Sequence, residues 1–144
     1  MTSPIRIVVP GTPAPKGSWI PTGRGVRPDN PMSVPWAHAV TWAAKAQMAG
    51  RALFRNTPLV LSAEFYLPHD GSKWLLPIGA RTGDLDKLLR NCGDALKGSV
   101  FDDDSRIVKF GTVVKVYATR ATGAVITLRP WRDSDQPEPC QEVG

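Results

Sequence analysis

Six aspartates lie within a short window of an otherwise basic chain. They are Asp84, Asp86, Asp94, Asp102, Asp103 and Asp104. Binding to nucleic acid is driven by Lys and Arg, so carboxylates by themselves add nothing to it in a chain of net charge +5. Carboxylate oxygens are the ligands that Mg²⁺ prefers, and two or three of them complete a site once waters and a phosphate oxygen join. The window therefore suggests a divalent-metal site beside a polyanion.

Such a site is suited to phosphodiester hydrolysis. A bound metal lowers the pKa of a water molecule, stabilises charge in the transition state and assists the leaving 3′-oxygen. A neighbouring cation, Lys87 or Arg90, would offset part of the transition-state charge. The spacing of these residues thus favours a nuclease.

Each acidic group also has a simpler interpretation. Asp84 can cap a helix that starts there, although capping explains one aspartate more easily than two. Asp94 shares a helix side with Asp86 and Arg90, so it can form ordinary i, i+4 ion pairs and is weaker as a ligand. The acidic triplet at 102–104 can be a solvated turn before a strand. Together, carboxylates at a helix start and a strand start favour convergence on one ion.

Two elements must position these carboxylates. An apolar stripe with i, i+3, i+4, i+7 spacing predicts an amphipathic helix from about Asp84 to Lys97, ended by Gly98. Its members are Leu85, Leu88, Leu89, Cys92 and Leu96. Residues 107–117 and 124–129 are β-rich, and the turn-prone residues between them predict a hairpin.

The rest of the chain completes an α+β pattern. We expect a strand at 5–9, a long basic loop to Pro31, a helix over 36–52 closed near Gly50, and a strand at 59–67 with one apolar face. With 144 residues the chain has room for one core. The prediction is a single domain over 1–132 with a mixed β-sheet flanked by helices, in the order β-α-β-α-β-β.

The basic charge is concentrated near the start of the chain. Residues 1–60 hold seven Lys or Arg against Asp29 alone, which makes a nucleic-acid partner plausible. Lys16, Arg24 and Arg27 lie in the long loop and are candidate DNA-binding residues. A flexible, solvated loop that makes no phosphate contacts explains this segment equally well.

Several classes of protein are disfavoured. No run approaches the roughly twenty apolar residues of a membrane span, and the opening residues lack a signal-peptide pattern. We therefore expect a cytoplasmic protein that has no membrane contact and no small-molecule cofactor. Cys92 and Cys140 form neither a disulfide framework nor a zinc spacing. Residues 133–144 are acidic with two prolines, which predicts a disordered tail.

Three segments resemble the RusA-type Holliday junction resolvases. They read Asp-Leu-Asp-Lys-Leu-Leu-Arg at 84–90, Asp-Ala-Leu-Lys-Gly at 94–98 and Asp-Asp-Ser-Arg-Ile at 103–107. The opening Val-Pro-Gly-Thr-Pro-Ala-Pro-Lys-Gly at 9–17 is similar to that of phage-borne members, so the resemblance spans most of residues 5–129. It implies a homodimer that uses Mg²⁺, or Mn²⁺ in its place, to nick four-way DNA junctions symmetrically in recombination and repair.

The resemblance also implies residue roles. Asp84, Asp86 and Asp104 would be the catalytic, metal-binding carboxylates, Asp103 would neighbour them in the metal site, and Asp94 would support the helix or the site.

Two positions depart from the family pattern. The Asn that follows the second Asp of the motif is Lys87 here, and the position of the family's catalytic Lys is Arg90. Arginine keeps the positive charge but does not readily give up a proton. A role in charge stabilisation would survive this change, whereas a role as an acid would pass to Lys87.

Two other functions are compatible with the same residues. One is a metal-dependent nuclease for flaps, forks or single strands, because the same carboxylate chemistry serves all of these substrates. The other is a non-catalytic DNA-binding module, whose DNA affinity would be indifferent to Mg²⁺. A calcium-binding module is remote, because the Asp-x-Asp-x-Asp-Gly spacing is absent.

Overall fold

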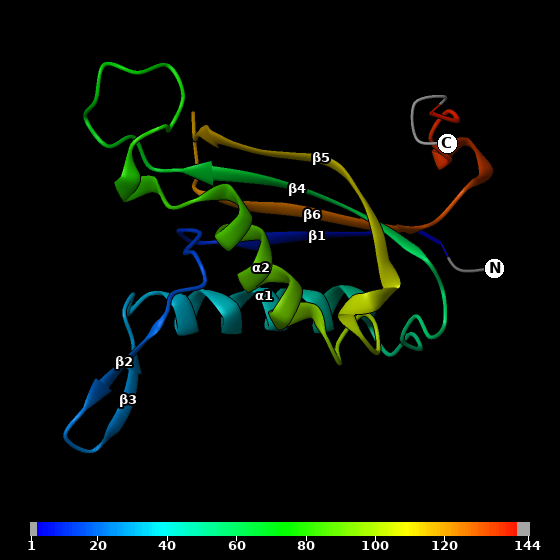
Figure 1. The fold of residues 1–144 in the computed structure, drawn as a ribbon, viewed down its shortest axis with the longest axis horizontal. Helices are drawn as coiled ribbons and strands as arrows, with labels where there is room; N and C mark the ends of the chain where they lie inside the picture. Colours follow the sequence, from blue (N-terminus) through cyan, green and yellow to red (C-terminus); the bar gives the residue numbers. More distant parts are fainter. Residues whose placement is uncertain (1–2, 141–144) are drawn as a thin grey trace.

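Four strands form a mixed sheet, and two helices cover one of its faces (Figure 1). The computed structural model describes residues 3–140. The elements in chain order are β1 (Ile5–Pro10), β2 (Trp19–Thr22), β3 (Gly25–Pro28), α1 (Ser33–Met48), β4 (Leu59–Leu67), α2 (Leu85–Leu96), β5 (Ile107–Tyr117) and β6 (Gly123–Pro130). Short 3-10 turns lie at Ala80–Thr82, Asp104–Arg106 and Asp133–Asp135. The mixed α+β class expected from the sequence is confirmed.

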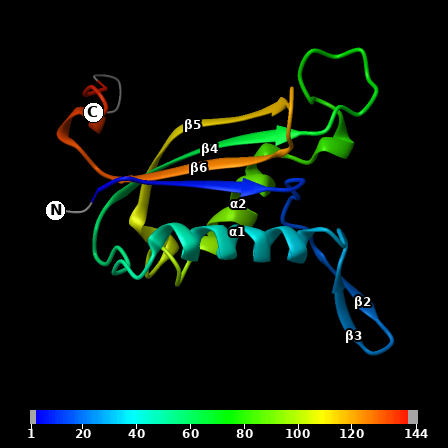
Figure 2. The same cartoon turned by 180° about the vertical axis from the view of Figure 1, so that it is seen from behind.

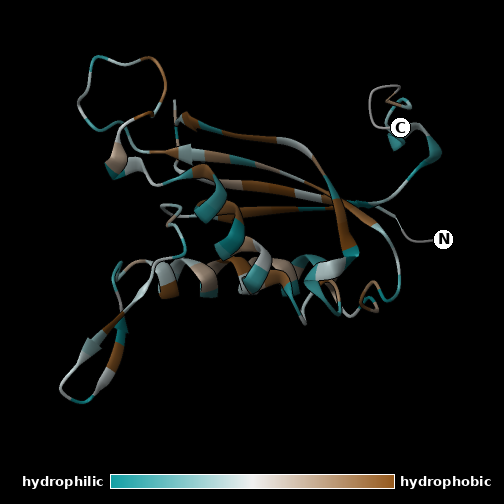
Figure 3. Ribbon diagram, viewed as in Figure 1, coloured by the Kyte–Doolittle hydropathy of each residue, from teal (hydrophilic) through white to brown (hydrophobic). Residues whose placement is uncertain are grey.

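The sheet has the strand order β1-β6-β4-β5. β6 pairs antiparallel with both β1 and β4, while β5 pairs parallel with β4. The alternating pattern of Leu59–Leu67 is observed as strand β4, whose buried side chains join the core. Figure 3 shows hydrophobic residues running along these strands.

The expected hairpin between β5 and β6 is wrong, because β4 lies between them. α2 belongs to the crossover that brings β5 back parallel to β4, as parallel neighbours require. β6 then pairs on the other side of β4, where Ala124, Ile126 and Leu128 are buried. Burial of this apolar face between two strands outweighs the local turn preference of residues 119–123.

The core forms between the sheet and the two helices. Trp36, Val40 and Ala44 of α1 are buried against it, together with Leu88, Cys92 and Leu96 of α2. Because these side chains recur every three or four residues, each helix presents one apolar side to the sheet. None of the helices within residues 3–140 combines the length and apolar character needed to cross a membrane.

The basic loop expected up to Pro31 contains a structured hairpin. β2 and β3 pair antiparallel, from Trp19 opposite Pro28 to Thr22 opposite Gly25. The hairpin projects away from the sheet and helices (Figures 1 and 2). Both of its strands carry a proline, which a two-stranded ribbon accepts because each strand is an edge. The expected element order therefore lacked two strands.

The fold also continues past the domain boundary expected at residue 132. Asp135 is buried, and both of its carboxylate oxygens accept hydrogen bonds from the Arg129 guanidinium at 2.6 and 2.7 Å. The backbone N–H of Arg132 also donates to this carboxylate, at 2.8 Å. These bonds hold the pKa of Asp135 well below its usual range. They keep residues 133–135 on the domain despite the acidic composition of the segment. Residues 141–144 of the expected tail lie outside the described residues.

Candidate active site on helix α2

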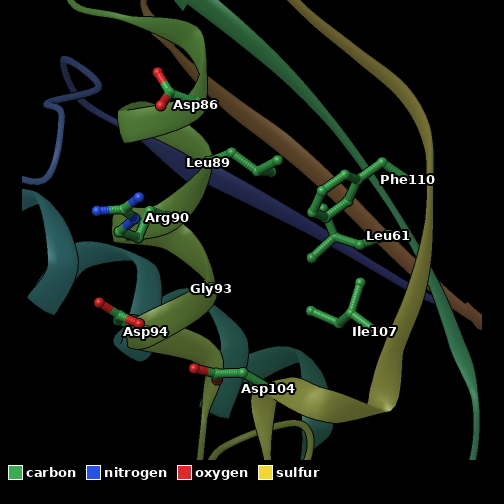
Figure 4. A pocket seen from close by; sticks show the side chains of 9 residues that line it. All are labelled: Leu61, Asp86, Leu89, Arg90, Gly93, Asp94, Asp104, Ile107 and Phe110. Carbon is green, nitrogen blue, oxygen red and sulfur yellow. The ribbon is translucent and has the colours of Figure 1, made fainter.

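A pocket of about 310 Å³ opens between α2 and the start of β5 (Figure 4). Its polar residues are Asp86, Arg90 and Asp94 of α2 and Asp104 of the turn before β5. The apolar lining consists of Leu61, Leu89, Ile107 and Phe110, and in Figure 4 Leu89 extends from α2 toward the other three. Polar groups over an apolar floor make this pocket the candidate active site.

Helix α2 places three of the polar residues. Leu88 and Cys92 are fully buried and fix one side of the helix against the core. Asp86, Arg90 and Asp94 follow at intervals of four residues, so they project from another side of the helix, one turn apart. The sequence prediction of a shared polar side is confirmed.

The three aspartates of the triplet at 102–104 have different surroundings. Asp102 accepts two hydrogen bonds from the Arg106 guanidinium, at 2.9 and 3.1 Å. The Oδ1 atom of Asp103 accepts from the backbone N–H of Ser105 at 3.0 Å. These bonds lower the pKa of both carboxyls and shape the turn. Asp104 is the member of the triplet that lines the pocket.

Asp104 differs from its neighbours in its electrostatics. Partial burial raises the pKa of this carboxyl first, and the negative charge of Asp94 raises it further. The two carboxylates are therefore close enough to repel each other. A cation placed between them would relieve that repulsion.

Asp84, Lys87 and Asp103 are not among the lining residues. Asp84 occupies the position before the first turn of α2, yet its side chain makes no capping hydrogen bond, so the expected cap is not observed. It forms an ion pair with Lys87 instead, at 3.5 Å between Oδ2 and Nζ. Both side chains are at least half exposed, which makes this pair a weak contributor to stability.

The expected convergence of Asp84, Asp86, Asp103 and Asp104 does not form. Within residues 3–140, no three His, Cys, Asp or Glu side chains are grouped closely enough to hold a metal ion among them. The carboxylates of the pocket nevertheless suit Mg²⁺ by their chemistry. This ion is usually held by one or two carboxylates together with waters and substrate phosphates, without an all-protein cage.

Lys115 supports the start of α2, a role that the sequence did not reveal. Its ammonium donates to the carbonyl oxygen of Gly83 at 2.7 Å and to the Thr82 hydroxyl at 3.1 Å. These bonds fix the chain directly before Asp84. The sequence gives no indication that this lysine makes such a contact, because its partner is thirty-two residues away.

Residues 13–16, which we call the strap, lie along α2. The side-chain amide of Asn91 is buried and donates to the carbonyl oxygens of Ala14 and Ser33, both at 3.0 Å. Pro15 approaches Gly83 so closely that a Cβ atom at that glycine would lie 3.2 Å from the proline ring. The strap is thereby attached to the start and the middle of the helix.

Lys16 ends the strap at the edge of the pocket. Its ammonium lies 3.1 Å from Oδ2 of Asp94, so Asp94 pairs with the strap and not with Arg90. The backbone N–H of Lys16 donates to the carbonyl oxygen of Lys87 at 3.0 Å. Lys16 was expected to contact DNA phosphates. In the structure its positive charge is paired with a carboxylate of the pocket.

Comparison with known proteins agrees with this geometry. The model of a protein family described as endodeoxyribonuclease RusA matches residues 10–129. That range includes the strap, α2, the acidic turn and all four strands of the main sheet in whole or in part. No curated protein matches the chain. With most of its length matched and a carboxylate-lined pocket within the match, the chain belongs to the RusA endodeoxyribonuclease family.

Proposed function

We propose that the chain is a divalent-metal-dependent endonuclease that resolves four-way DNA junctions by paired, symmetric nicks. The observation that carries this proposal is the pocket lined by Asp86, Arg90, Asp94 and Asp104, in a chain of an endodeoxyribonuclease family. Carboxylates in a basic protein that acts on DNA serve best as ligands for a cation.

Asp86 and Asp104 are the residues proposed to hold Mg²⁺ or Mn²⁺, with Asp84 entering as a further ligand. The bound ion would act as a Lewis acid on the phosphate and lower the pKa of the attacking water. Arg90 is placed to offset negative charge on the phosphate, because it lines the same pocket. The apolar wall of Leu61, Ile107 and Phe110 restricts bulk water on one side.

The symmetry of the substrate favours a homodimer. A four-way junction has two-fold symmetry, and its resolution needs one nick in each of two opposed strands. Two copies related by a two-fold axis provide two pockets with the matching relation. We therefore propose that the active species is a dimer of this chain.

Arg24 and Arg27 are proposed to contact DNA phosphates, since both are exposed on the projecting hairpin. Each phosphate contact releases counterions, so its loss lowers the slope of log affinity against log salt. We expect Arg24→Gln to reduce that slope by about one for junction and duplex DNA alike. Fluorescence anisotropy titrations in EDTA across a salt series measure it, with Arg51→Gln, three residues beyond the end of α1, as the control. Equal slopes for the Arg24 variant and the natural chain would remove Arg24 from the interface.

The proposed function is tested with a labelled synthetic four-way junction and a linear duplex of matched sequence. We expect paired nicks confined to the junction with Mg²⁺ and no cleavage with EDTA. Asp86→Asn should lower the rate at least about 100-fold, because it removes a charged ligand without changing the size of the side chain. Asp133→Asn, at an exposed aspartate outside the pocket, is the matched control.

Other results would replace the proposal. Cleavage of flaps, forks or linear DNA in preference to junctions would indicate a nuclease of another specificity. DNA affinity that is independent of Mg²⁺, with no cleavage by the natural chain or by the Asp86→Asn variant, would indicate a binding module.

A further inference from the structure

The hairpin β2–β3 combines exposed aromatic and basic side chains on a projecting element. Trp19 is 57% exposed and Val26 is 63% exposed. Arg24 lies at the turn and Arg27 on β3, both exposed. The segment 16–28 has no acidic residue, so its net formal charge is positive. Positive charge with aromatic surface is the combination that binds unstacked nucleic acid.

Trp19 stands at the root of the hairpin, close to the catalytic helix. Trp19 is one of the residues that line a hollow of about 90 Å³, together with Lys16, His38 and Asn91. Asn91 belongs to α2, which carries Asp86 and Arg90. More than half of Trp19 remains open to solvent.

The root of the hairpin is also fixed in place. The backbone N–H of Asp29 donates to the carbonyl oxygen of Ser18 at 2.9 Å, which closes the ribbon. Gly17 lies so near Asp29 that an added Cβ atom would collide with its carboxylate. The strap continues directly from this root to α2, where Asn91 and Asp94 hold it.

We propose that this hairpin enters the branch point of a DNA junction and that Trp19 stacks on a base exposed there, while Arg24 and Arg27 hold the flanking phosphates. This inference rests on the proposed function and adds the element that recognises the branch. A branch point presents base faces that lack a continuous stack, whereas linear duplex presents none. Apolar side chains inserted at such steps stabilise the open form, and an aromatic ring stacks on any base.

The charges of the hairpin favour DNA over a second copy of the chain as its occupant. The same ribbon carries two arginines, Arg27 one pair along from Trp19 and Arg24 at the turn, and like charges repel when the same patch meets itself across a two-fold axis. Phosphates flank every base in DNA, so the same spacing of cation and ring suits a nucleic acid. Trp19 should then contribute to junction affinity and little to duplex affinity.

The test uses the full chain in EDTA, so that binding is measured without cleavage. The probes are a four-way junction with 2-aminopurine beside the branch point and a linear duplex with the same label. We expect Trp19→Ala to weaken junction binding about 5- to 150-fold, the range for loss of one stacked base. Duplex affinity should stay within about twofold. The natural chain should change the 2-aminopurine fluorescence of the junction, and the alanine variant should not.

Two further variants complete the test. Trp19→Phe should restore most of the junction affinity, because a smaller ring still stacks. Trp42→Ala removes a tryptophan that is 76% exposed on α1 and should leave both affinities unchanged. Circular dichroism of each variant confirms that the fold is retained.

The outcomes separate the inference from the proposed function. If the natural chain prefers junctions and Trp19→Ala keeps that preference, the inference is overturned and the proposed function stands. Equal losses for junction and duplex would assign Trp19 to general DNA contact and would also overturn it. A fall in oligomeric mass on loss of Trp19 would assign the ring to contact between copies. A natural chain without junction preference would overturn the proposed function and the inference together.

Discussion

Arg90 lies between two carboxylates on the polar side of α2, with Asp86 one turn before it and Asp94 one turn after it. Asp94 already has a cation 3.1 Å away in Lys16, so Arg90 is available to a phosphate that enters the pocket. Substitutions of Arg90 therefore show whether a fixed positive charge at this position is sufficient for cleavage or whether the side chain must donate a proton. Arginine provides only the charge, because its guanidinium does not readily give up a proton.

We expect Arg90→Ala to lower the rate of junction cleavage about 100-fold, as loss of one charge-stabilising donor does. Arg90→Lys should retain most of the rate, because a lysine still supplies positive charge. Single-turnover rates at saturating junction with Mg²⁺ measure both, and Lys45→Ala on an exposed part of α1 is the control. A lysine variant much faster than the natural chain would contradict the charge-only role and indicate proton donation.

The pocket residues were predictable from the sequence in part. The spacing of Asp86 and Arg90 identified them because a helix has a fixed period. Asp94 has the same spacing, but its importance depends on Asp104, which returns to the helix only through tertiary folding. Lys115 was missed for the same reason. Local periodicity shows which side chains share a face, and it does not show which distant segment will meet that face.

Among the contacts that attach the strap to α2, one is made by a buried side-chain amide. Asn91 donates from one nitrogen to two carbonyl oxygens, on the strap and at the start of α1. It is 2% exposed, so water cannot replace these bonds. A carboxylate at this position would have the same shape as the amide. It has no N–H group to donate, so its oxygens would face the two carbonyl oxygens, which are also acceptors.

We expect Asn91→Asp to lower the free energy of unfolding by about 3 kcal/mol, because an unpaired charge would be buried. Urea unfolding with linear extrapolation measures this change. Asn56→Asp makes the same chemical change at an exposed position and should have little effect. If the two variants unfold at the same urea concentration, the amide is not the attachment that the structure indicates.

Predictions at the level of elements succeeded where periodicity was strong. Strands β4 and β5 have the expected bounds, and α2 differs from the expected helix by one residue at each end. The hairpin β2–β3 was missed because Pro21, Pro28 and two glycines mask the short β-prone runs. The pairing of β5 with β6 was wrong because turn-prone residues report local geometry, while pairing is decided by distant strands.

For the whole molecule, the pair of Asp135 and Arg129 secures the end of the described chain. The folded pKa of Asp135 lies below its unfolded value of about 3.9, because the Arg129 guanidinium and the Arg132 N–H stabilise the charged form. A depressed pKa contributes stability that is fully present above the unfolded value. That contribution is lost as the pH falls toward the folded value.

We expect Asp135→Asn to lower the Tm by a few degrees at pH 7 and to have progressively less effect as the pH falls below about 4. Thermal melts of the variant and the natural chain from pH 7 to pH 2 show the convergence. Asp133→Asn, two residues away and exposed, should match the natural chain throughout. A difference in Tm that is independent of pH would mean that packing, and not the ion pair, is what the aspartate provides.

The position of β6 in the sheet has a consequence for biosynthesis. Among the strands of residues 3–140, β6 leaves the ribosome last, yet it lies between β1, which leaves first, and β4. Until it emerges, β1 has no neighbour in the sheet, and β4 presents an open apolar edge to its surroundings. A nascent chain that stops before Gly123 therefore cannot close its sheet. Folding of the sheet therefore waits for the synthesis of β6, so a chain terminated before this strand would be a substrate for chaperones and proteases and not a smaller working protein.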